Sequence, residues 1–200
     1  MKKDLSSADS AHFKEIQDLS REELLGYITN LVKNWAAIDG LWFRAVERAY
    51  GMDAALRMDG EVWTRYAAIE ADRLKRMLNL PKNGGVKALI QALKFRNHAS
   101  LNKYTIAQTA ENKVVFQMNE CRQQVGRKRK NLPPHPCKEP GYLEYSSFAS
   151  AIDSRFKTSC VCCPPDETPE GVWCSWEFEL VEPELYSGAR HGIKDNQPPR

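Results

Sequence analysis

The chain of 200 residues has no long apolar run. No stretch approaches the roughly 18 consecutive apolar residues that a membrane helix needs, which argues against a membrane protein. The N-terminus, MKKDLSSADSAHFKE, has no apolar segment after its lysines, so it does not resemble a secretory signal. We therefore expect a cytoplasmic protein, in which disulfides are rare and cysteines serve metal binding, redox chemistry, catalysis or plain packing.

The usual metal-binding templates are also missing. The chain has only four histidines and no paired CxxC motifs. Its six cysteines follow the spacing Cys121-x15-Cys137-x22-Cys160-x-Cys162-Cys163-x10-Cys174, which fits no common zinc template. Three of them nevertheless fall within CVCCPP, residues 160–165. Thiolates bind zinc and iron–sulfur clusters strongly, and the prolines beside Cys137 and Cys163 would stiffen the loops that carry them.

Neither sign of charge dominates, since the net charge is only +3. The cations concentrate in residues 121–140, where Glu139 is the only acid. This patch has four consecutive cations at 127–130, but it has no interleaved aromatic residue for base stacking and no DNA-binding motif. We therefore disfavour a nucleic-acid partner and interpret the patch as a solvated, charged strand edge.

In the N-terminal half, the apolar residues recur with the period of an α-helix. Ser20 and Glu23 form a capping-box sequence, and Gly51 suits a helix C-cap. Between them an apolar stripe runs at spacings of three and four: Leu24, Ile28, Leu31, Trp35, Ile38 and Trp42. Further helices are predicted at 52–58, at 60–78 with Asp59 as the cap, and at 86–96.

After residue 100 the period changes to that of strands. We predict a hairpin of strands at 104–109 and 114–122, loops at 131–141 and 160–171, a helix at 142–157 and a last strand at 172–181. The sequence therefore predicts an α+β fold, in which an N-terminal helical layer is joined by a small antiparallel sheet and one late helix in the C-terminal half. Its parts are a flexible N-terminus at 1–18, a helical part at 19–100, a cysteine-rich α+β part of the same domain at 101–182, and a flexible tail at 183–200.

Every cysteine is predicted to lie at or near the end of a helix or strand, and loops at one end of a small sheet can converge. We therefore expect one site built from Cys121, Cys137, Cys160, Cys162, Cys163 and Cys174. Zinc or an iron–sulfur cluster is the expected occupant, while a reactive thiol without metal and a set of inert, buried thiols are the alternatives. In an enzyme, metal-bound water or Cys121 would attack, and Arg122 or Arg127 could bind a substrate carboxylate.

Carboxylates on the long helices form a second group of candidates. Asp39 lies four residues after Trp35 and so shares the apolar stripe, where a carboxylate has to be paired or functional. The plain interpretation is a salt bridge from Asp39, Glu47 or Glu70 to Arg44, Arg65 or Arg73. The sharper interpretation is that one of these acids faces a pocket and binds a substrate amine or a metal.

Two groups of motifs carry a family resemblance. The first is Trp35-Ala-Ala-Ile-Asp39-Gly-Leu-Trp42-Phe43 with Glu47 and Glu61-Val-Trp63, and the second is Cys121-Arg122-x-Gln124-x-x-Arg127, Pro136-Cys137, Phe148-x-x-x-Ile152-Asp153-x-Arg155, Cys160-x-Cys162-Cys163-Pro164-Pro165-Asp166 and Cys174-x-Trp176-x-Phe178. Together they resemble a family of small bacterial and archaeal (prokaryotic) cytosolic proteins of unassigned function. That family is more distantly similar to L-2-amino-thiazoline-4-carboxylic acid hydrolase. The resemblance implies hydrolysis of a C–N or C–S bond in a small heterocycle, through an activated thiol or a metal-bound water.

The leading function is therefore small-molecule binding at a thiolate metal site, combined with hydrolysis. The alternative from another class is a non-catalytic sensor or scaffold, whose metal only holds the loops together. The expected partner is a small-molecule ligand or substrate, and a homodimer is compatible with the sequence.

Overall fold

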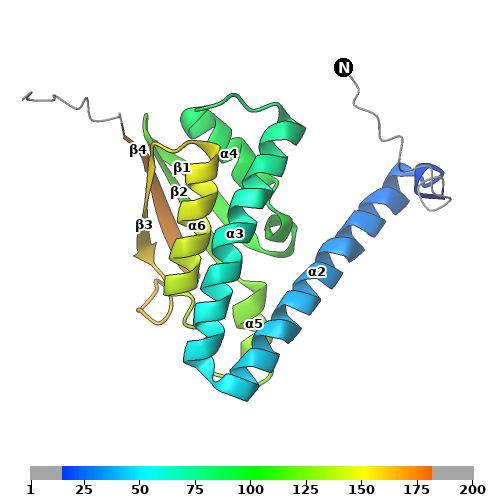
Figure 1. Cartoon of the computed structure of the whole chain (residues 1–200), viewed down its shortest axis with the longest axis vertical. Coiled ribbons are helices and arrows are strands. Elements are labelled where there is room, and N and C mark those ends of the chain that lie inside the picture. Colours follow the sequence, from blue (N-terminus) through cyan, green and yellow to red (C-terminus); the bar gives the residue numbers. More distant parts are fainter. Residues whose placement is uncertain (1–14, 182–200) are drawn as a thin grey trace, which may run out of the picture.

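The computed structural model describes residues 15–181, which form an α+β fold (Figure 1). The first half contains α2 (Arg21–Tyr50), α3 (Met52–Leu78), α4 (Gly85–Lys94) and the 3₁₀ helix η1 (Asn97–Leu101). The second half contains β1 (Lys103–Ala110), β2 (Lys113–Glu120), α5 (Arg122–Arg129), α6 (Lys138–Ile152), β3 (Phe156–Cys162) and β4 (Cys174–Leu180). The predicted fold class is confirmed. The ends predicted to be flexible, 1–18 and 183–200, lie outside the described residues except for 15–18.

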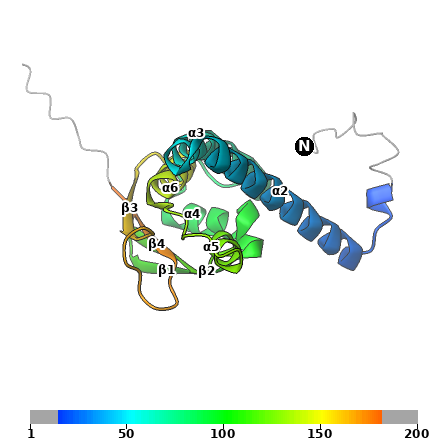
Figure 2. The ribbon, with the colours of Figure 1, turned by 90° about the horizontal axis from the view of Figure 1, so that it is seen from below.

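The four strands form one antiparallel sheet in the order β1-β2-β4-β3. Helix α6 lies against the sheet, α3 packs along α6, and α2 joins α3 at one end and then diverges from the rest of the molecule (Figures 1 and 2). Alternate side chains of β2 and β4 pack in one core with α4 and α6: Val114, Phe116, Met118, Trp176, Phe178, Leu89, Leu93, Tyr145, Phe148 and Ile152. Removing this apolar surface from water is the main source of stability.

Helix α2 begins as its capping box predicts. Ser20 Oγ accepts a hydrogen bond from the backbone N–H of Glu23, and Glu23 Oε2 accepts one from the backbone N–H of Ser20. The helix ends at Gly51, whose φ of 84° lies in the region that favours glycine. It runs without a break for 30 residues.

The predicted break before Gly60 is wrong, because α3 is one continuous helix of 27 residues. Its small residues Ala55, Gly60 and Ala67 are buried, which lets α3 approach α6 closely. A Cβ at Gly60 would lie 2.9 Å from Leu143 Cδ1 of α6. Packing against α6 along the whole length therefore outweighs the local Asp59 capping signal.

The cysteine-rich half also differs from the prediction in three places. CVC at 160–162 belongs to strand β3 and not to a loop, since Cys160 pairs with Trp176 and Cys162 with Ser175 of β4. The basic segment after β2 is the short helix α5 and not a strand edge. Helix α6 covers 138–152 in place of 142–157, because Pro140 is tolerated within the first turn of a helix.

No helix within residues 15–181 combines the length and the hydropathy that a membrane crossing requires.

Candidate thiol–imidazole site

The antiparallel order of the strands brings four of the six cysteines to one end of the sheet. The ends of β2 and β3 lie beside the start of β4, so Cys121, Cys163 and Cys174 enter the same region. Cys137, at the start of α6, reaches it because the backbone N–H of Lys138 donates to the Pro164 carbonyl at 2.9 Å. Loops that are more than fifty residues apart in the chain thus meet at these thiols.

The closest contact in this group is between Cys137 and Cys163, whose sulfur atoms lie 3.6 Å apart. The hydrogen bond with Cys163 lowers the pKa of Cys137 and raises that of Cys163, so Cys163 donates and Cys137 holds the negative charge. The His135 imidazole lowers the pKa of Cys137 further, against the opposing effect of burial. Gln124 Nε2 also lies 3.6 Å from the Cys137 sulfur as a donor. Cys137 is therefore the thiol that this site favours as a thiolate.

Cys121, the predicted nucleophile, has the opposite environment. It lies at the N-cap of α5, where the backbone hydrogen bonds of Gln124 and Gln123 favour a thiolate, but burial outweighs them and raises its pKa to about 12. A thiol with this pKa is protonated at neutral pH and is a poor nucleophile. Of these two thiols, the surroundings of Cys137 favour the thiolate and those of Cys121 the protonated form.

Cys160 and Cys162 lie on strand β3, and both interact electrostatically with Cys174. Burial is the largest cause of the raised pKa of each. Cys160 lines a cavity of about 600 Å³ whose wall also contains both chain neighbours of Cys137. The complete lining is Leu56, Pro136, Lys138, Glu139, Tyr142, Leu143, Cys160 and Pro165. Of the cysteines, Cys160 alone lines this mostly apolar space, and Cys137 borders it through its two chain neighbours.

His135 occupies the centre of the site. Only 2% of the residue is exposed, and its ring meets Phe43 of α2 edge-on, with 4.5 Å between the ring centroids. Gln124 fixes its backbone in both directions, accepting from the His135 N–H at 2.9 Å and donating to its carbonyl at 2.8 Å. Both ring nitrogens are enclosed by the protein, and a hydrogen bond and the charge of His135 both favour the thiolate form of Cys137. The imidazole is thus placed to stabilise a negative charge on Cys137.

Arg127 does not have the predicted role of a substrate anchor. Its Nη1 and Nη2 donate to the two carboxylate oxygens of Glu47 at 2.9 Å each, and its Nε donates to the Pro133 carbonyl at 2.6 Å. The guanidinium is therefore used to tie α2 to the loop that carries His135. Glu47 thus has the predicted salt bridge with a different arginine. Arg122 is exposed at the start of α5 and does not line the cavity.

Asp39 and Asp59 approach His135 from α2 and α3. Burial raises the pKa of Asp39, and the charge of His135 partly offsets this. Burial also raises the pKa of Asp59 to about 6, with a further increase from Asp39. At neutral pH Asp59 is thus partly protonated, which suits a group that gives and takes protons.

We expect Asp59→Asn to stabilise the protein at high pH. The pKa of Asp59 is raised by folding, so its contribution to stability is present below its ordinary pKa and is lost as the pH rises through about 6. The variant should therefore exceed the wild type in free energy of unfolding by on the order of 2 kcal/mol at pH 8 and by little near pH 4. Urea denaturation at both pH values measures this, with Asp53→Asn, exposed on the same helix, as the control. The expectation would be contradicted if the difference in free energy of unfolding between the variant and the wild type were the same at both pH values.

The third acid, Glu70, belongs to a buried ion-pair network. Arg96 Nε lies 2.9 Å from Glu70 Oε2, and Arg96 Nη1 lies 2.8 Å from Glu144 Oε1. The Arg96 guanidinium also stacks on Phe148, 4.4 Å from the ring centroid. The predicted salt bridge of Glu70 is thus present, again with a different arginine, and it joins α3 to α6.

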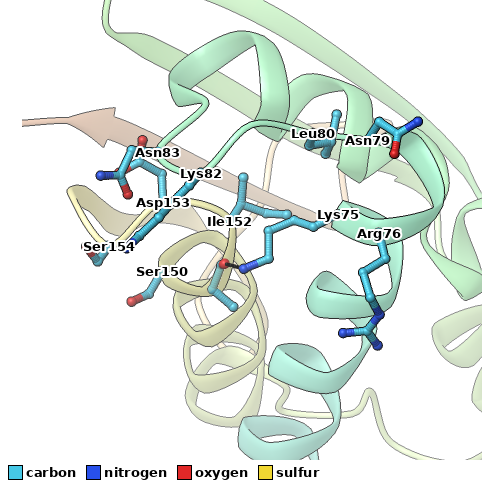
Figure 3. Close-up of a pocket in the computed structure, with 11 residues that line it drawn as sticks. Lys75, Arg76, Asn79, Leu80, Lys82, Asn83, Ser150, Ile152, Asp153 and Ser154 are labelled. Carbon is cyan, nitrogen blue, oxygen red and sulfur yellow. Dashed lines mark hydrogen bonds between the residues drawn. The ribbon is translucent and has the colours of Figure 1, made fainter. Parts of the chain in front are cut away.

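A second pocket, of about 590 Å³, lies at the other ends of α3 and α6 (Figure 3). It contains none of the predicted site residues. Its cations Lys75, Arg76 and Lys82 are accompanied by Asp153, and Lys75 is already bonded to the Ala151 carbonyl and paired with Asp72. Asp153 is itself paired with Arg155, so Arg76 and Lys82 give this pocket a positive character.

The fit of a metal to these residues rests on one pair of thiols. Two thiolates on one tetrahedral zinc ion lie about 3.8 Å apart, close to the observed separation of Cys137 and Cys163. Within residues 15–181, however, no three or more His, Cys, Asp or Glu side chains are arranged to hold a metal ion. A bound zinc ion or iron–sulfur cluster thus stays a prediction.

Sequence patterns did little to indicate that three residues belong to this site. In the sequence, Gln124 belongs to one motif of the family resemblance, Asp59 is predicted only as a helix cap, and His135 has no predicted role. The run Pro133-Pro134-His135-Pro136 was the available signal, because a histidine held between prolines has a fixed backbone position.

Comparisons with known proteins identify the family but no activity. No curated protein and no solved structure is significantly similar to this chain. The similarity to the thiazoline carboxylate hydrolase is therefore still a prediction. A family model described as "Family of unknown function (DUF6125)" matches residues 17–180, which include both groups of motifs and the whole candidate site. The chain therefore belongs to this family, DUF6125.

Proposed function

We propose that this protein binds a small molecule beside Cys137 and hydrolyses a C–N or C–S bond in it, with the Cys137 thiolate as the nucleophile. The observation that carries this proposal is the 3.6 Å contact in which the Cys163 thiol supports a charge on Cys137. A thiolate, not a thiol, is the reactive form of cysteine. The same contact makes Cys137 a better nucleophile than Cys121.

The cavity beside Cys137 supports a small and partly apolar ligand. Leu56, Tyr142 and Leu143 supply apolar walls, which suit a planar ring. Lys138 is the cation of this wall, although it also pairs with Asp166. In place of Arg122 and Arg127, Lys138 is the group that would orient a carboxylate on the ligand.

The chemistry available here is addition followed by hydrolysis. The Cys137 thiolate attacks the carbon of a C=N or C=O group, a C–S bond forms, and the π-electron pair moves to nitrogen or oxygen. When that pair returns, the neighbouring C–N or C–S bond breaks, and the departing atom takes a proton from His135 or Asp59. Water then cleaves the bond between carbon and Cys137, which releases the product and restores the thiol. The substrate class predicted from the resemblance, a small heterocycle, is compatible with these steps.

We expect Cys163→Ala to raise the pKa of Cys137 from about 5 and so to shift the pH profile of its alkylation to higher pH. The loss of rate should be largest near pH 5, because below the pKa each added pKa unit lowers the thiolate fraction about tenfold. The measurement is the rate of iodoacetamide labelling at Cys137 between pH 5 and 9, resolved by mass spectrometry. The matched control is Cys121→Ser, which removes a protonated, buried thiol and should leave this profile unchanged. An unchanged profile in Cys163→Ala would contradict the proposal.

Hydrolysis itself is tested with a panel of small cyclic amidines and thiazolines that carry a carboxylate. Ring opening should occur with the wild type and should be lost in Cys137→Ser, while labelling shows that the other thiols stay as they are. Labelling at Cys137 without turnover of any member would favour the alternative of a non-catalytic small-molecule sensor.

A second candidate function is a thiolate metal site, predicted to hold zinc or an iron–sulfur cluster. The specific observations in its favour are the sulfur–sulfur distance and the imidazole of His135 beside Cys137. Metal analysis of protein purified without oxygen tests it. One zinc or one cluster per chain, lost in Cys137→Ser, would support this function, and metal-free protein that is fully folded would remove it.

A further inference from the structure

The apolar stripe of α2 faces away from the protein's own core. Phe43 is the only residue of this helix that is buried. The stripe positions other than Trp35 are exposed instead, and so is the neighbouring Leu41, with exposed fractions of 67% for Trp42 and 65% for Leu41. We call the set Leu24, Ile28, Leu31, Ile38, Leu41 and Trp42 the α2 face; each of its members has at least 37% of its surface exposed.

This face is too large for an isolated protein surface. Six large apolar side chains, exposed to this extent, present on the order of 700 Å² per copy, whereas the largest patch on a typical monomer is about 300–600 Å². A standard protein interface buries roughly 800 Å² on each partner, so the α2 face alone comes close to a complete interface.

The two halves of α2 differ in how many stabilising contacts they make with the rest of the protein. The C-terminal half is held by Phe43 against His135 and by Glu47 on Arg127. The N-terminal half diverges from the other helices (Figures 1 and 2), and every residue described from Arg21 to Tyr27 except Tyr27 is exposed. Isolated helical segments this short are marginal in water, so an unpartnered N-terminal half has little to stabilise it.

The spacing of the stripe indicates what covers it. Leu24, Ile28, Leu31, Trp35, Ile38 and Trp42 alternate steps of four and three, which is the a/d repeat of helices that pair along their length. Trp35, in the middle of this series, also packs on α3 of its own chain, where its ring lies 5.6 Å from Tyr66 and 6.0 Å from Trp63 between centroids. A 30-residue helix is about 45 Å long, so the repeat covers much of its length.

The charges at the two ends of α2 are opposite. The first turn carries Arg21, Glu22 and Glu23, and the last turns carry Arg44, Glu47 and Arg48. The first end is therefore acidic by one charge and the last end basic by one charge. A parallel pair of such helices would place like charges together, whereas an antiparallel pair places the acidic end of each helix beside the basic end of the other.

We propose that the α2 face binds the α2 face of a second copy of this chain, with the two helices antiparallel. The apolar layers are then Leu24 on Trp42 of the second copy, Ile28 on Ile38, and Leu31 on Trp35. The arrangement is symmetric, as expected for a two-fold dimer. It also supports the N-terminal half of α2, the helix whose inner side carries Asp39 and Phe43 to the thiol–imidazole site.

The first test is the mass of the full chain by sedimentation equilibrium over a range of concentrations. We expect a dimer for the wild type and a mass shifted towards the monomer by Leu31→Glu, with at least a tenfold increase in the dissociation constant. Lys33→Glu is the control, because it changes charge on the same half of α2 but on the side away from the stripe. A wild type that is monomeric at every concentration would overturn the proposal and leave this face to the chain's own ends or to another protein.

The second test concerns orientation and uses variants that are checked for helix content by circular dichroism. In the antiparallel pair, Ile28 of one copy meets Ile38 of the other, so the double variant Ile28→Glu/Ile38→Lys places opposite charges in contact. We expect this double variant to dimerise more tightly than Ile28→Glu or Ile38→Lys alone. A double variant weaker than both single variants would overturn the antiparallel arrangement.

Discussion

Replacing Arg96 with methionine should lower the free energy of unfolding by about 3–5 kcal/mol, the usual effect of leaving buried charges without their partner. Only 1% of the Arg96 side chain is exposed, and it lies between Glu70 and Glu144. Methionine fills part of the space over Phe148 but cannot pair with either carboxylate. Two buried acids would then remain uncompensated on α3 and α6.

The pH dependence of this loss distinguishes charge from packing. Burial raises the pKa of Glu144 to about 7 even beside Arg96. Arg96 lowers the pKa of Glu144, so its removal should raise that pKa further. Glu144 is neutral in mild acid with or without Arg96, and the loss should therefore be smaller at pH 5 than at pH 8. Urea denaturation at both pH values measures it, with the exposed Lys94→Met as the control. A loss below about 1 kcal/mol at pH 8 would contradict the role of the network.

Replacing Trp176 with alanine should also cost about 3–5 kcal/mol, because it empties the centre of the core. Trp176 is 1% exposed and stacks on Tyr145 of α6 with 5.1 Å between the ring centroids. A Cβ on Gly141 would lie 2.9 Å from its ring, so the start of α6, next to Cys137, rests directly on this indole. The variant should therefore also change the alkylation rate of Cys137.

The matched variant is Trp176→Phe, which keeps an aromatic ring in the same place. The indole N–H has no hydrogen-bond partner among the described residues, so its removal leaves no other group unpaired. We expect a loss below about 1.5 kcal/mol, measured by thermal and urea unfolding. A phenylalanine variant as unstable as the alanine variant would show that packing of the ring is not what Trp176 contributes.

Local signals in the sequence were enough to predict several elements. The capping box at Ser20, the stop at Gly51 and the alternating strands of the hairpin depend on neighbouring residues alone, and each occurs as predicted. The elements that were mispredicted depend on distant partners. CVC becomes strand β3 because β4 supplies its hydrogen bonds, and α3 runs through Asp59-Gly60 because α6 packs along it.

The location of the site could be predicted from the sequence, but the charge state of each thiol in it could not. Cysteines at element ends indicated a meeting point, and Cys121, Cys137, Cys163 and Cys174 do lie together there. Which thiol carries charge depends on burial and on one hydrogen bond from Cys163, and neither can be read from spacing. Arg127 was predicted to bind a substrate because nothing in the sequence pairs it with Glu47, 80 residues earlier.

The stripe of α2 was predicted correctly as a helical pattern, yet a pattern cannot state which molecule buries it. An apolar face that packs on the same chain and one that packs on a second copy have the same periodicity. Only the exposure of Leu41 and Trp42 separates the two.

The most direct measurement is a competition among all six thiols of the native wild type for limiting iodoacetamide at pH 7, with each site quantified by mass spectrometry. Exposure alone would favour Cys160 and Cys162, which are the least enclosed of the thiols discussed. The thiolate account predicts that Cys137 is labelled first and that Cys121 is among the last. Labelling of Cys160 or Cys162 ahead of Cys137 would contradict a reactive thiolate at this site.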